Sequence, residues 1–478
     1  MQMNTHQQAV LNAVTSGGHV VVNAGPGTGK TFTLAGVANS NQGRPIINFC
    51  FNRNTKLQAD EKMPSWTKNY TFHGAAYGQV GKYYQKQLNT KLSPRVIADH
   101  FNCDEKDATV VKYTIRKFAT SDSNCITGWN VPFESFKGKP KPEQEQYKEQ
   151  IVTLSRRVWN ECMMKKNPKF GVEHDMYLKL WEMEGARVSG RFEIVMVDES
   201  QDMVPVNISA LRKIYGQRIC VGDTRQELYA FRQSEDVRKS MQFDHELHLV
   251  ESKRFGQAIA DVANQVQVLL PETYPPIIGA GGESKVLMSG TPKGQYVVLC
   301  RSNLGLLGEA IKAIDAGQSI HVIGSLTESI LLMESAWYLF LGETRKVIHP
   351  SLRMAGDWET LVELAKEDQE FAMAVKRVEE FRGQIPFICE KVKMSGETSR
   401  QRAEVILSTV HKFKGDEHDI IKLGDDFPDL VRFSKKERRY VPLTSEICCF
   451  FVAVTRAKRE LYANTTISQL STWKEWIS

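Results

Sequence analysis

The feature that most constrains this chain is a glycine-rich turn near its start. Residues 24–31 read Ala-Gly-Pro-Gly-Thr-Gly-Lys-Thr. The run His19–Asn23 before the turn is rich in valine and typical of a buried parallel strand, whereas Phe32–Ala38 after it has helical periodicity. A strand, a glycine loop and a helix in this order form the setting in which a loop binds phosphate. The sequence therefore predicts a phosphate-binding loop.

The residue types in this loop suit a nucleoside triphosphate. Glycines let the backbone turn its N–H groups onto the β- and γ-phosphates. Lys30 neutralises phosphate charge, and the Thr31 hydroxyl can reach Mg²⁺ at the start of the helix. Ala24 replaces the first glycine of the strict pattern, and a small residue there still permits close approach. The predicted nucleotide-binding residues of the loop are Gly25, Pro26, Gly27, Thr28, Gly29, Lys30, Thr31 and Phe32.

An acidic motif supplies the second half of such a site. The apolar run Phe192–Val197 ends in Asp198 and Glu199. We expect Asp198 to hold Mg²⁺ through water and Glu199 to polarise the attacking water. The alternative is that these carboxylates cap the next helix, and Asp202 is a second candidate for an N-terminal helix cap.

The rest of the chain predicts two α/β cores. Short apolar runs alternate with helical patterns, as in doubly wound α/β units. Tyr77–Val188 and Leu326–Lys393 break this rhythm and are interpreted as helical insertions, and Pro271–Gly294 is interpreted as a connecting loop. The further predicted strands are Ile46–Phe51, Phe192–Val197, Arg218–Val221, Tyr296–Cys300, Ser319–Ile323 and Val405–Ser408.

Composition excludes several classes of protein. The 478 residues are 41% hydrophobic and 25% charged, enough to build a sizeable core. The apolar run Ile447–Val454 is far shorter than the roughly 20 residues of a membrane-spanning helix, and no signal segment opens the chain. Nine cysteines without a C-x-x-C pair argue against a disulfide framework and a zinc ribbon. We expect a soluble, intracellular, multidomain protein. Its net charge of +6 permits nucleic-acid binding without establishing it.

Four motifs carry a resemblance to a known family. Asp198–Asp202 reads DESQD, and Gly222–Arg232 reads GD-x-x-Q-x-x-Y-x-F-R. Ser408–Glu417 and Val452–Lys458 follow in the same order. The set resembles motifs II, III, V and VI of superfamily 1 DNA helicases of the UvrD, Rep and PcrA type. Three further segments look most similar to the F-box DNA helicase branch, although without its F-box: Phe51–Asn54, Tyr70–His73 and Lys253–Gly256.

The resemblance implies roles at the nucleotide. Gln7 matches the adenine-reading glutamine of the family, Gln226 the γ-phosphate sensor, and Glu417 the ribose contact. Arg254 and Arg456 match two arginines that reach the γ-phosphate from the second core domain. Permanently charged, planar guanidinium groups suit a phosphoryl transition state.

Two positions depart from the family pattern. Lys253 stands where bacterial relatives often carry an aromatic residue that stacks on adenine, and Phe255 is the alternative for that role. Motif V has Asp416 and His418 at positions that are usually apolar. The departures bear on adenine selectivity and on local packing.

The resemblance also implies a DNA track. Tyr229 and Phe231 match base-stacking positions, and the alternative is that they pack between the two lobes. Thr409 and His411 are candidates for phosphate or base contacts. The residues that match the strand-contacting motifs Ia and Ib are Asn52, Arg53, Phe72 and His73. Phe72 could instead be a core residue. The basic stretches Lys137–Lys169 and Arg432–Arg439 are either duplex-facing surfaces or solvated faces.

Together these features predict an α/β protein with two RecA-like P-loop NTPase domains, each with a parallel sheet and a mainly helical insertion. Residues 1–76 and 189–250 form the first domain, with insertion 77–188. Residues 251–324 and 395–478 form the second domain, with insertion 325–394. The resemblance implies a monomeric, Mg²⁺- and ATP-dependent 3′→5′ DNA helicase that acts on single strands and on junctions of single-stranded and duplex DNA. No membrane partner is expected.

Three alternatives remain open: a DNA-stimulated ATPase that displaces proteins with little unwinding, a nucleotide-dependent binding switch, and an RNA-unwinding enzyme. The expected location is the cytoplasm or nucleoid, the nucleus in a eukaryote, or the host cytoplasm for a viral protein.

Overall fold

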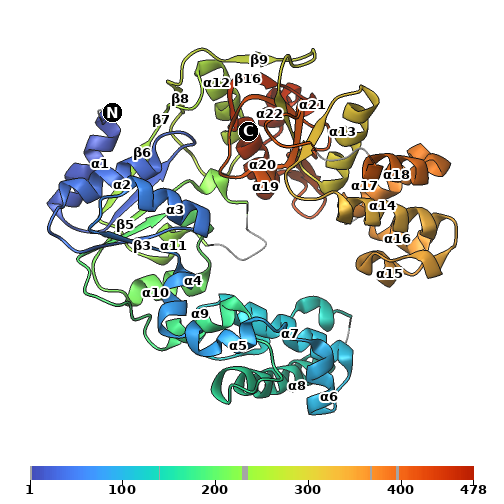
Figure 1. The fold of residues 1–478 in the computed structure, drawn as a ribbon, viewed down its shortest axis with the longest axis horizontal. Helices are drawn as coiled ribbons and strands as arrows, with labels where there is room; N and C mark the ends of the chain where they lie inside the picture. Colours follow the sequence, from blue (N-terminus) through green and yellow to red (C-terminus); the bar gives the residue numbers. More distant parts are fainter. Residues whose placement is uncertain (1–2, 139, 229–234, 366–368, 395–397, 478) are drawn as a thin grey trace. The chain divides into compact units, whose positions relative to one another are not determined.

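The computed structural model describes residues 3–138, 140–228, 235–365, 369–394 and 398–477. The chain divides into two compact units (Figure 1). The first comprises Met1–Gly25 and Gly29–Leu249, and the second comprises Pro26–Thr28 and Val250–Ser478. Each unit contains its own six-stranded sheet.

The sheet of the first unit is parallel throughout. Its strands pair in the order β3-β2-β4-β5-β1-β6. A single strand, β5, therefore lies between the glycine-loop strand β1 and the acidic strand β4, and all strands end at one edge of the sheet. The strands are β1 (Val20–Ala24), β2 (Ile46–Phe49), β3 (Thr67–Tyr70), β4 (Ile194–Asp198), β5 (Gln217–Gly222) and β6 (His245–Leu249).

Helices cover both faces of this sheet, which is why β1, β2 and β4 are buried along their full lengths. On one face, Val20, Val22 and Ile194 pack with α1 (Thr5–Ser16) and α2 (Lys30–Ser40). On the other, the alternate residues Val21, Val195 and Val197 join a core that includes α9 (His174–Met183) and α10 (Pro205–Lys213). α3 (Arg53–Lys62) packs with α1 and α2.

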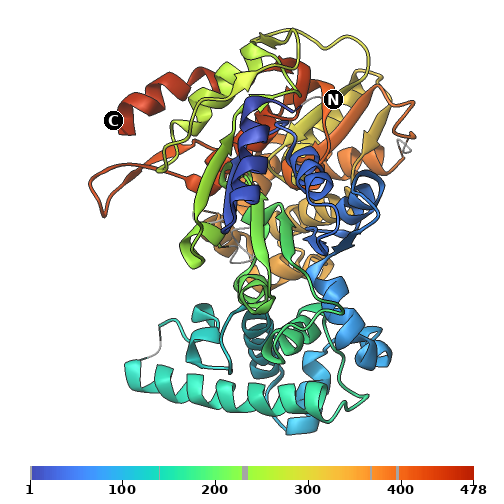
Figure 2. The ribbon, with the colours of Figure 1, turned by 90° about the vertical axis from the view of Figure 1, so that its left-hand side faces the viewer.

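Among the described residues, the segment between β3 and β4 contains helices and no strand. Figures 1 and 2 both show α5 to α8 at the end of the first unit that is remote from α1. Their apolar residues belong to the same core cluster as one face of the sheet, so this segment is packed onto the sheet without a separate core. The helices are α4 (Phe72–Gln79), α5 (Gln85–Leu88), α6 (Pro94–Phe101), α7 (Glu105–Thr120) and α8 (Lys141–Trp159), followed by α9.

The second unit repeats the parallel design. Its strands pair in the order β11-β12-β10-β13-β16-β9, and every pair is parallel. α13 (Asn303–Asp315), α14 (Thr327–Phe340), α17 (Gln369–Phe381) and α18 (Ile385–Met394) share a core with one face of this sheet. The strands are β9 (Lys285–Leu287), β10 (Tyr296–Cys300), β11 (Ile320–Val322), β12 (Val405–Thr409), β13 (His418–Leu423) and β16 (Ala457–Tyr462).

The fold class predicted from the sequence is confirmed: the chain is α/β, with two parallel sheets and mainly helical segments inserted into each. The prediction for Pro271–Gly294 is wrong in part, because this segment contains two short strands. Ile278–Gly279 pairs with Glu251–Ser252, and Lys285–Leu287 pairs with β16 as an edge strand. Ile447–Val454 lies in the buried helix α20 (Thr444–Val454). None of the described helices has the length and apolar character needed to cross a bilayer. All nine cysteines are free thiols.

A buried ionic network joins the helical segment of the first unit to its sheet layer. Lys179 and Glu182 on α9 are both fully buried, with 2.7 Å between Nζ and Oε2. Lys179 also donates to the Ser121 carbonyl. From α10, Ser209 Oγ donates to Glu182 Oε1 over 2.7 Å, and Lys213 donates to the same carboxylate. Burial alone would raise the pKa of Glu182, but the bonds from Lys179, Lys213 and Ser209 hold that pKa below its usual range.

The Glu182→Ala substitution should destabilise the first unit by about 3 kcal/mol, because it leaves the Lys179 ammonium buried without its counter-ion. Urea denaturation followed by circular dichroism measures this loss, with the exposed Glu184→Ala on the same segment as control. Because the folded pKa of Glu182 is lowered, its contribution is present above the ordinary glutamate pKa of about 4.3 and is lost as the pH falls through the folded value. A variant as stable as the control at neutral pH would contradict the assignment.

Candidate nucleotide and DNA site

The glycine loop ends where α2 begins. Gly29 is the N-cap of α2, with a left-handed backbone at φ 83°, and Gly27 has φ 72°. The helix starts at once, with the Thr33 N–H donating to the Gly29 carbonyl over 2.8 Å. Only glycine adopts this conformation without Cβ strain. Lys30 and Thr31 consequently occupy the first turn of α2, whose unpaired N–H groups and positive dipole end favour an anion.

Gln7 lies beside this loop. A Cβ added to Gly29 would stand 2.9 Å from Gln7 Nε2. The Gln7 side chain is buried and belongs to the capping box that starts α1: its Oε1 accepts from the Asn4 N–H, and its own N–H donates to Asn4 Oδ1. The first unit thus brings the predicted adenine-reading residue next to the predicted phosphate loop.

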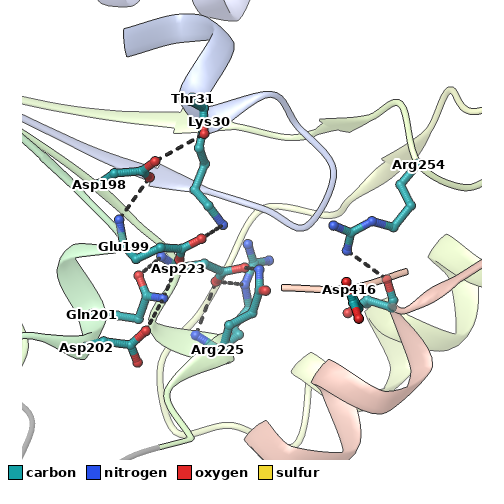
Figure 3. A network of polar contacts seen from close by, with 12 residues as sticks. Lys30, Thr31, Asp198, Glu199, Gln201, Asp202, Asp223, Arg225, Arg254 and Asp416 are labelled. Atoms are coloured by element: carbon teal, nitrogen blue, oxygen red, sulfur yellow. Dashed lines mark hydrogen bonds and ion pairs between the residues drawn. The ribbon is translucent and has the colours of Figure 1, made fainter. Parts of the chain in front are cut away.

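The first turn of α2 meets the acidic motif at the carboxyl edge of the sheet. Thr31 Oγ1 donates to Asp198 Oδ2 over 3.1 Å, and Lys30 Nζ lies 3.3 Å from Glu199 Oε1. Figure 3 shows both interactions. Burial, together with the neighbouring Glu199 carboxylate, raises the pKa of Asp198 to about 6. A buried carboxylate of this kind is energetically costly without a nearby cation.

Glu199 has a left-handed backbone, with φ 55°. This conformation costs a non-glycine residue about 1 kcal/mol, a strain of the kind that functional sites retain. Glu199 lies between the end of β4 and the 3₁₀ turn Ser200–Asp202. Its second oxygen, Oε2, accepts from Gln201 Nε2 over 2.6 Å. The carboxylate is therefore held between Lys30 and Gln201.

Gln201 connects the acidic motif to the loop after β5 (Figure 3). Its Oε1 accepts from the Asp223 N–H over 2.9 Å. Asp223 is fully buried and accepts from Gln226 Nε2 and from Arg225 Nε, each over 2.7 Å. A continuous chain of hydrogen bonds thus runs from Glu199 to the predicted phosphate sensor Gln226.

Sequence reasoning assigned no role to Gln201, Asp223 or Arg225, although all three lie within the motif letters. The suggestion that Asp202 caps a helix is wrong: α10 begins after Val204 without a side-chain cap, and Asp202 is buried in the 3₁₀ turn.

A cavity of about 360 Å³ opens beside the carboxylates, within the first unit. Its lining includes Asp198 and Glu199 together with all four predicted strand-contacting residues of that unit: Asn52, Arg53, Phe72 and His73.

Three of these four residues also have a local structural role. The fourth, Arg53, is an exposed residue at the start of α3. Asn52 Oδ1 accepts from the Thr55 N–H and caps α3. Phe72 is largely buried and stacks on Phe49 at a centroid distance of 4.3 Å, so its alternative interpretation as a core residue has direct packing support. His73 Nε2 lies 2.8 Å from Asp175 Oδ1.

The second unit gathers its own predicted site residues. Arg254 Nε bonds to Glu417 Oε2 over 2.6 Å, and its Nη1 donates to the Thr455 carbonyl over 3.0 Å. Arg456, the next residue, is buried, and its Nε donates to the Val452 carbonyl. Both predicted arginines and the predicted ribose contact therefore lie in one neighbourhood. Phe255 is fully buried, which removes it as a surface for stacking on adenine.

Of the remaining predicted DNA contacts, the structure describes Thr409 and His411 only. Thr409 ends β12 and is buried, and His411 is half-buried on α19 (Val410–Phe413). Tyr229 and Phe231 lie outside the described residues, so their assignment stays a prediction.

Comparison with known proteins agrees with this site. The family described as "AAA domain" matches residues 6–232, which include the glycine loop, the acidic motif and Gln226. F-box DNA helicase 1 of Gallus gallus is 28% identical over 507 residues, covering 98% of this chain and 50% of that protein. F-box DNA helicase protein 1 of Schizosaccharomyces pombe is 26% identical over 524 residues, covering 98% and 58%. The chain thus spans about half the length of these relatives.

Two solved structures are similar over most of this chain. Arterivirus nonstructural protein 10 (helicase) gives a TM-score of 0.34 at 14% identity, covering 98% of this chain and 64% of that one. The same protein in complex with DNA gives a TM-score of 0.36 at 12% identity, covering 98% of this chain and 65% of that one. At these TM-scores the structural similarity supports no conclusion beyond the sequence similarity.

The first unit thus has the glycine loop and parallel sheet typical of a P-loop core, and residues 6–232 are similar to the family described as "AAA domain". The sequence matches extend the relationship over 98% of the chain, and the predicted resemblance is confirmed. Over 98% of its length the chain is therefore similar to DNA helicases of the F-box branch.

The residues at the loop fit Mg²⁺. This ion prefers oxygen ligands and is commonly held by one or two protein oxygens together with substrate phosphates and water. The Thr31 hydroxyl and the buried Asp198 carboxylate, joined over 3.1 Å, supply such a pair. The ion would neutralise phosphate charge when bound.

The Lys30→Ala substitution should weaken ATP binding by about 2 kcal/mol, or about 30-fold, because it removes the cation that would bond to the phosphates. Titration of a fluorescent ATP analogue measures the change. Lys62→Ala, an exposed lysine at the end of α3, is the matched control and should bind as the unaltered protein does. Equal binding by both variants would rule out a phosphate-binding role for Lys30.

Proposed function

We propose that this chain is an ATP-dependent DNA helicase that moves along single-stranded DNA and separates the duplex ahead of it. The observation that carries the proposal is the cluster at the carboxyl edge of the first sheet, where Lys30 and Thr31 meet Asp198 and Glu199. The cluster combines groups that bind a triphosphate with a carboxylate suited to activating water. The similarity to F-box DNA helicases supports DNA as the nucleic acid.

In the proposed reaction, Lys30 neutralises phosphate charge, and Thr31 and Asp198 would hold Mg²⁺. Glu199 accepts a proton from the attacking water, while Arg254 and Arg456 stabilise the charge on the γ-phosphoryl group. Gln7 reads adenine, and Glu417 contacts the ribose. The Arg254–Glu417 ion pair then has to rearrange, because both side chains are assigned to the nucleotide.

Coupling to DNA is proposed to run through Gln226. Its bond to Asp223, and the link from Asp223 through Gln201 to Glu199, form one network that can respond to the γ-phosphate. Tyr229 and Phe231 follow Gln226 in the chain and are assigned to stacking on bases. Asn52, Arg53, Phe72, His73, Thr409 and His411 are assigned to the rest of the strand. Closure of the two domains around ATP would advance the DNA in the 3′→5′ direction.

The proposed domains are residues 1–76 with 189–250 and residues 251–324 with 395–478, each a RecA-like domain, with helical insertions at 77–188 and 325–394. The proposed location is wherever the cellular or viral DNA resides.

Unwinding of tailed duplexes tests the proposal. We expect strand displacement on a duplex with a 3′ single-stranded tail and little on one with a 5′ tail. Glu199→Gln should lose nearly all turnover yet keep ATP binding, because the amide cannot take up the proton while Lys30 remains available to the phosphates. Displacement that prefers the 5′ tail would refute the polarity, and full activity of Glu199→Gln would refute its role.

A second candidate is an ATPase that displaces proteins from single strands and unwinds poorly. It shares the whole ATP site and differs only in its action on duplex DNA. Strong ATPase stimulation by single-stranded DNA, combined with absent strand displacement, would favour this candidate. RNA and DNA compared as activators of the ATPase test the RNA alternative, and slow, DNA-independent turnover would favour a binding switch.

A further inference from the structure

A basic hairpin projects from the second unit and has no part in the proposed ATP site. It consists of β14 (Val431–Ser434) and β15 (Arg439–Pro442), which pair antiparallel and form a sheet of their own. In Figure 2 the hairpin is the orange-red loop that extends away from the body of the unit. The two strands are joined by the four residues Lys435–Arg438.

The two faces of the hairpin differ in chemistry. Phe433 pairs with Tyr440 on one face, and the Tyr440 ring stacks on Trp476 of α22 (Leu470–Ile477) at a centroid distance of 4.5 Å. Side chains alternate along a strand, so the next pairs, Arg432 with Val441 and Ser434 with Arg439, lie on the opposite face. The aromatic face therefore anchors the hairpin on α22, and the face with the two arginines is directed away from that anchor.

Positive charge is concentrated on this hairpin. Residues 432–439 contain five cations and one carboxylate, Glu437, and all six charged side chains are exposed. Glu437 pairs with Arg439 over 2.7 Å. Arg432, Lys435, Lys436 and Arg438 have no ion-pair partner among the described residues. Mutual repulsion of these cations is unfavourable in the isolated protein, and an anionic partner would relieve it.

The backbone of the turn is strained at a charged residue, which favours a function for that charge. Arg438 has a left-handed backbone with φ 53°, a conformation that glycine adopts without strain and that costs other residues about 1 kcal/mol or more. The turn is held by the Glu437 N–H donating to Ser434 Oγ over 3.2 Å. A charged residue thus occupies the position where an uncharged glycine would be most stable.

The size of the hairpin fits duplex DNA better than duplex RNA. Four residues per strand span about 14 Å. The major groove of B-form DNA is about 12 Å wide and about 8.5 Å deep and admits a two-stranded ribbon, whereas the major groove of A-form RNA is too narrow. A ribbon with cations at its turn and on one face can bond to phosphates on both sides of the DNA groove.

From this shape and charge, we infer that the hairpin Val431–Pro442 is a contact surface for duplex DNA, which it enters through the major groove. The cations of its turn bind the phosphate backbone without reading sequence. The inference rests on the proposed function in one respect, namely that DNA is the substrate. It assigns the double-stranded arm of that substrate to a surface separate from the single-strand residues.

Binding of three nucleic acids by three proteins tests the inference. The nucleic acids are a blunt DNA duplex, a single strand of equal length and an RNA duplex of the same sequence. The proteins are the unaltered chain, the turn variant Lys435→Gln/Lys436→Gln/Arg438→Gln, and the control Lys285→Gln/Lys376→Gln/Arg402→Gln. The control removes three exposed charges from elsewhere on the same unit and leaves the net charge equal to that of the turn variant. Thermal unfolding verifies that all three proteins are folded.

The turn variant should bind the DNA duplex about 10-fold more weakly than the control. The slope of log K against log salt should be shallower by about 2.7, or about 0.9 for each phosphate that the turn no longer neutralises. The variant's affinity for single-stranded DNA and for the RNA duplex should equal that of the control, as should its ATPase activity with single-stranded DNA. Equal duplex affinity for turn variant and control overturns the inference. An equal weakening on all three nucleic acids also overturns it, because that result describes a general polyanion contact.

The same experiment separates this inference from the proposed function. If the unaltered chain shows no ATPase activity with single-stranded DNA, the proposed motor function fails, whatever the duplex-binding comparison gives. If that activity is present and the turn variant binds duplex as the control does, the motor function stands and the hairpin assignment fails.

Discussion

The contact of Lys30 and Thr31 with Asp198 and Glu199 is the interaction on which the proposed ATP site depends. The four side chains come from segments more than 160 residues apart in sequence, and the parallel sheet brings them to one edge. β5 lies between β1 and β4, so the glycine loop and the acidic motif face each other across one intervening strand. Lys30 offsets the charge that Glu199 and the buried Asp198 place at this edge.

A second constraint is the network that extends from this cluster. Gln201 and Asp223 are both buried, and each uses its side chain to connect one motif to the next. Buried polar groups of this kind are costly unless every partner is present. A displacement of Glu199 would thus shift Gln226, because the hydrogen bonds between them are costly to break one at a time. In the second unit, Arg254 and Glu417 form a comparable pair near Arg456. In the proposed function, the network of the first unit and the Arg254–Glu417 pair of the second unit both act on ATP.

Local sequence predicted the first unit's nucleotide loop well, because glycines, a lysine and a β-branched strand act over a few residues. It missed β6 and β16, whose sequences His-Glu-Leu-His-Leu and Ala-Lys-Arg-Glu-Leu-Tyr are polar, since neighbouring strands and helices decide their pairing. It also missed edge strand β9, three residues in a segment rich in proline and glycine. The role of Gln201 was unpredictable because one of its partners, Asp223, follows a strand that is distant in sequence. Asp202 is a residue type that often caps helices, but no helix starts directly after it.

We propose that Arg254 stabilises the γ-phosphoryl group of ATP, and the Arg254→Lys substitution tests this role. This substitution keeps the charge and most of the length but removes the planar fork of donors. Single-turnover ATP hydrolysis in the presence of single-stranded DNA should fall by about 100-fold or more, while ATP affinity stays within a few-fold of the unaltered chain. Hydrolysis at the unaltered rate would contradict this role of Arg254.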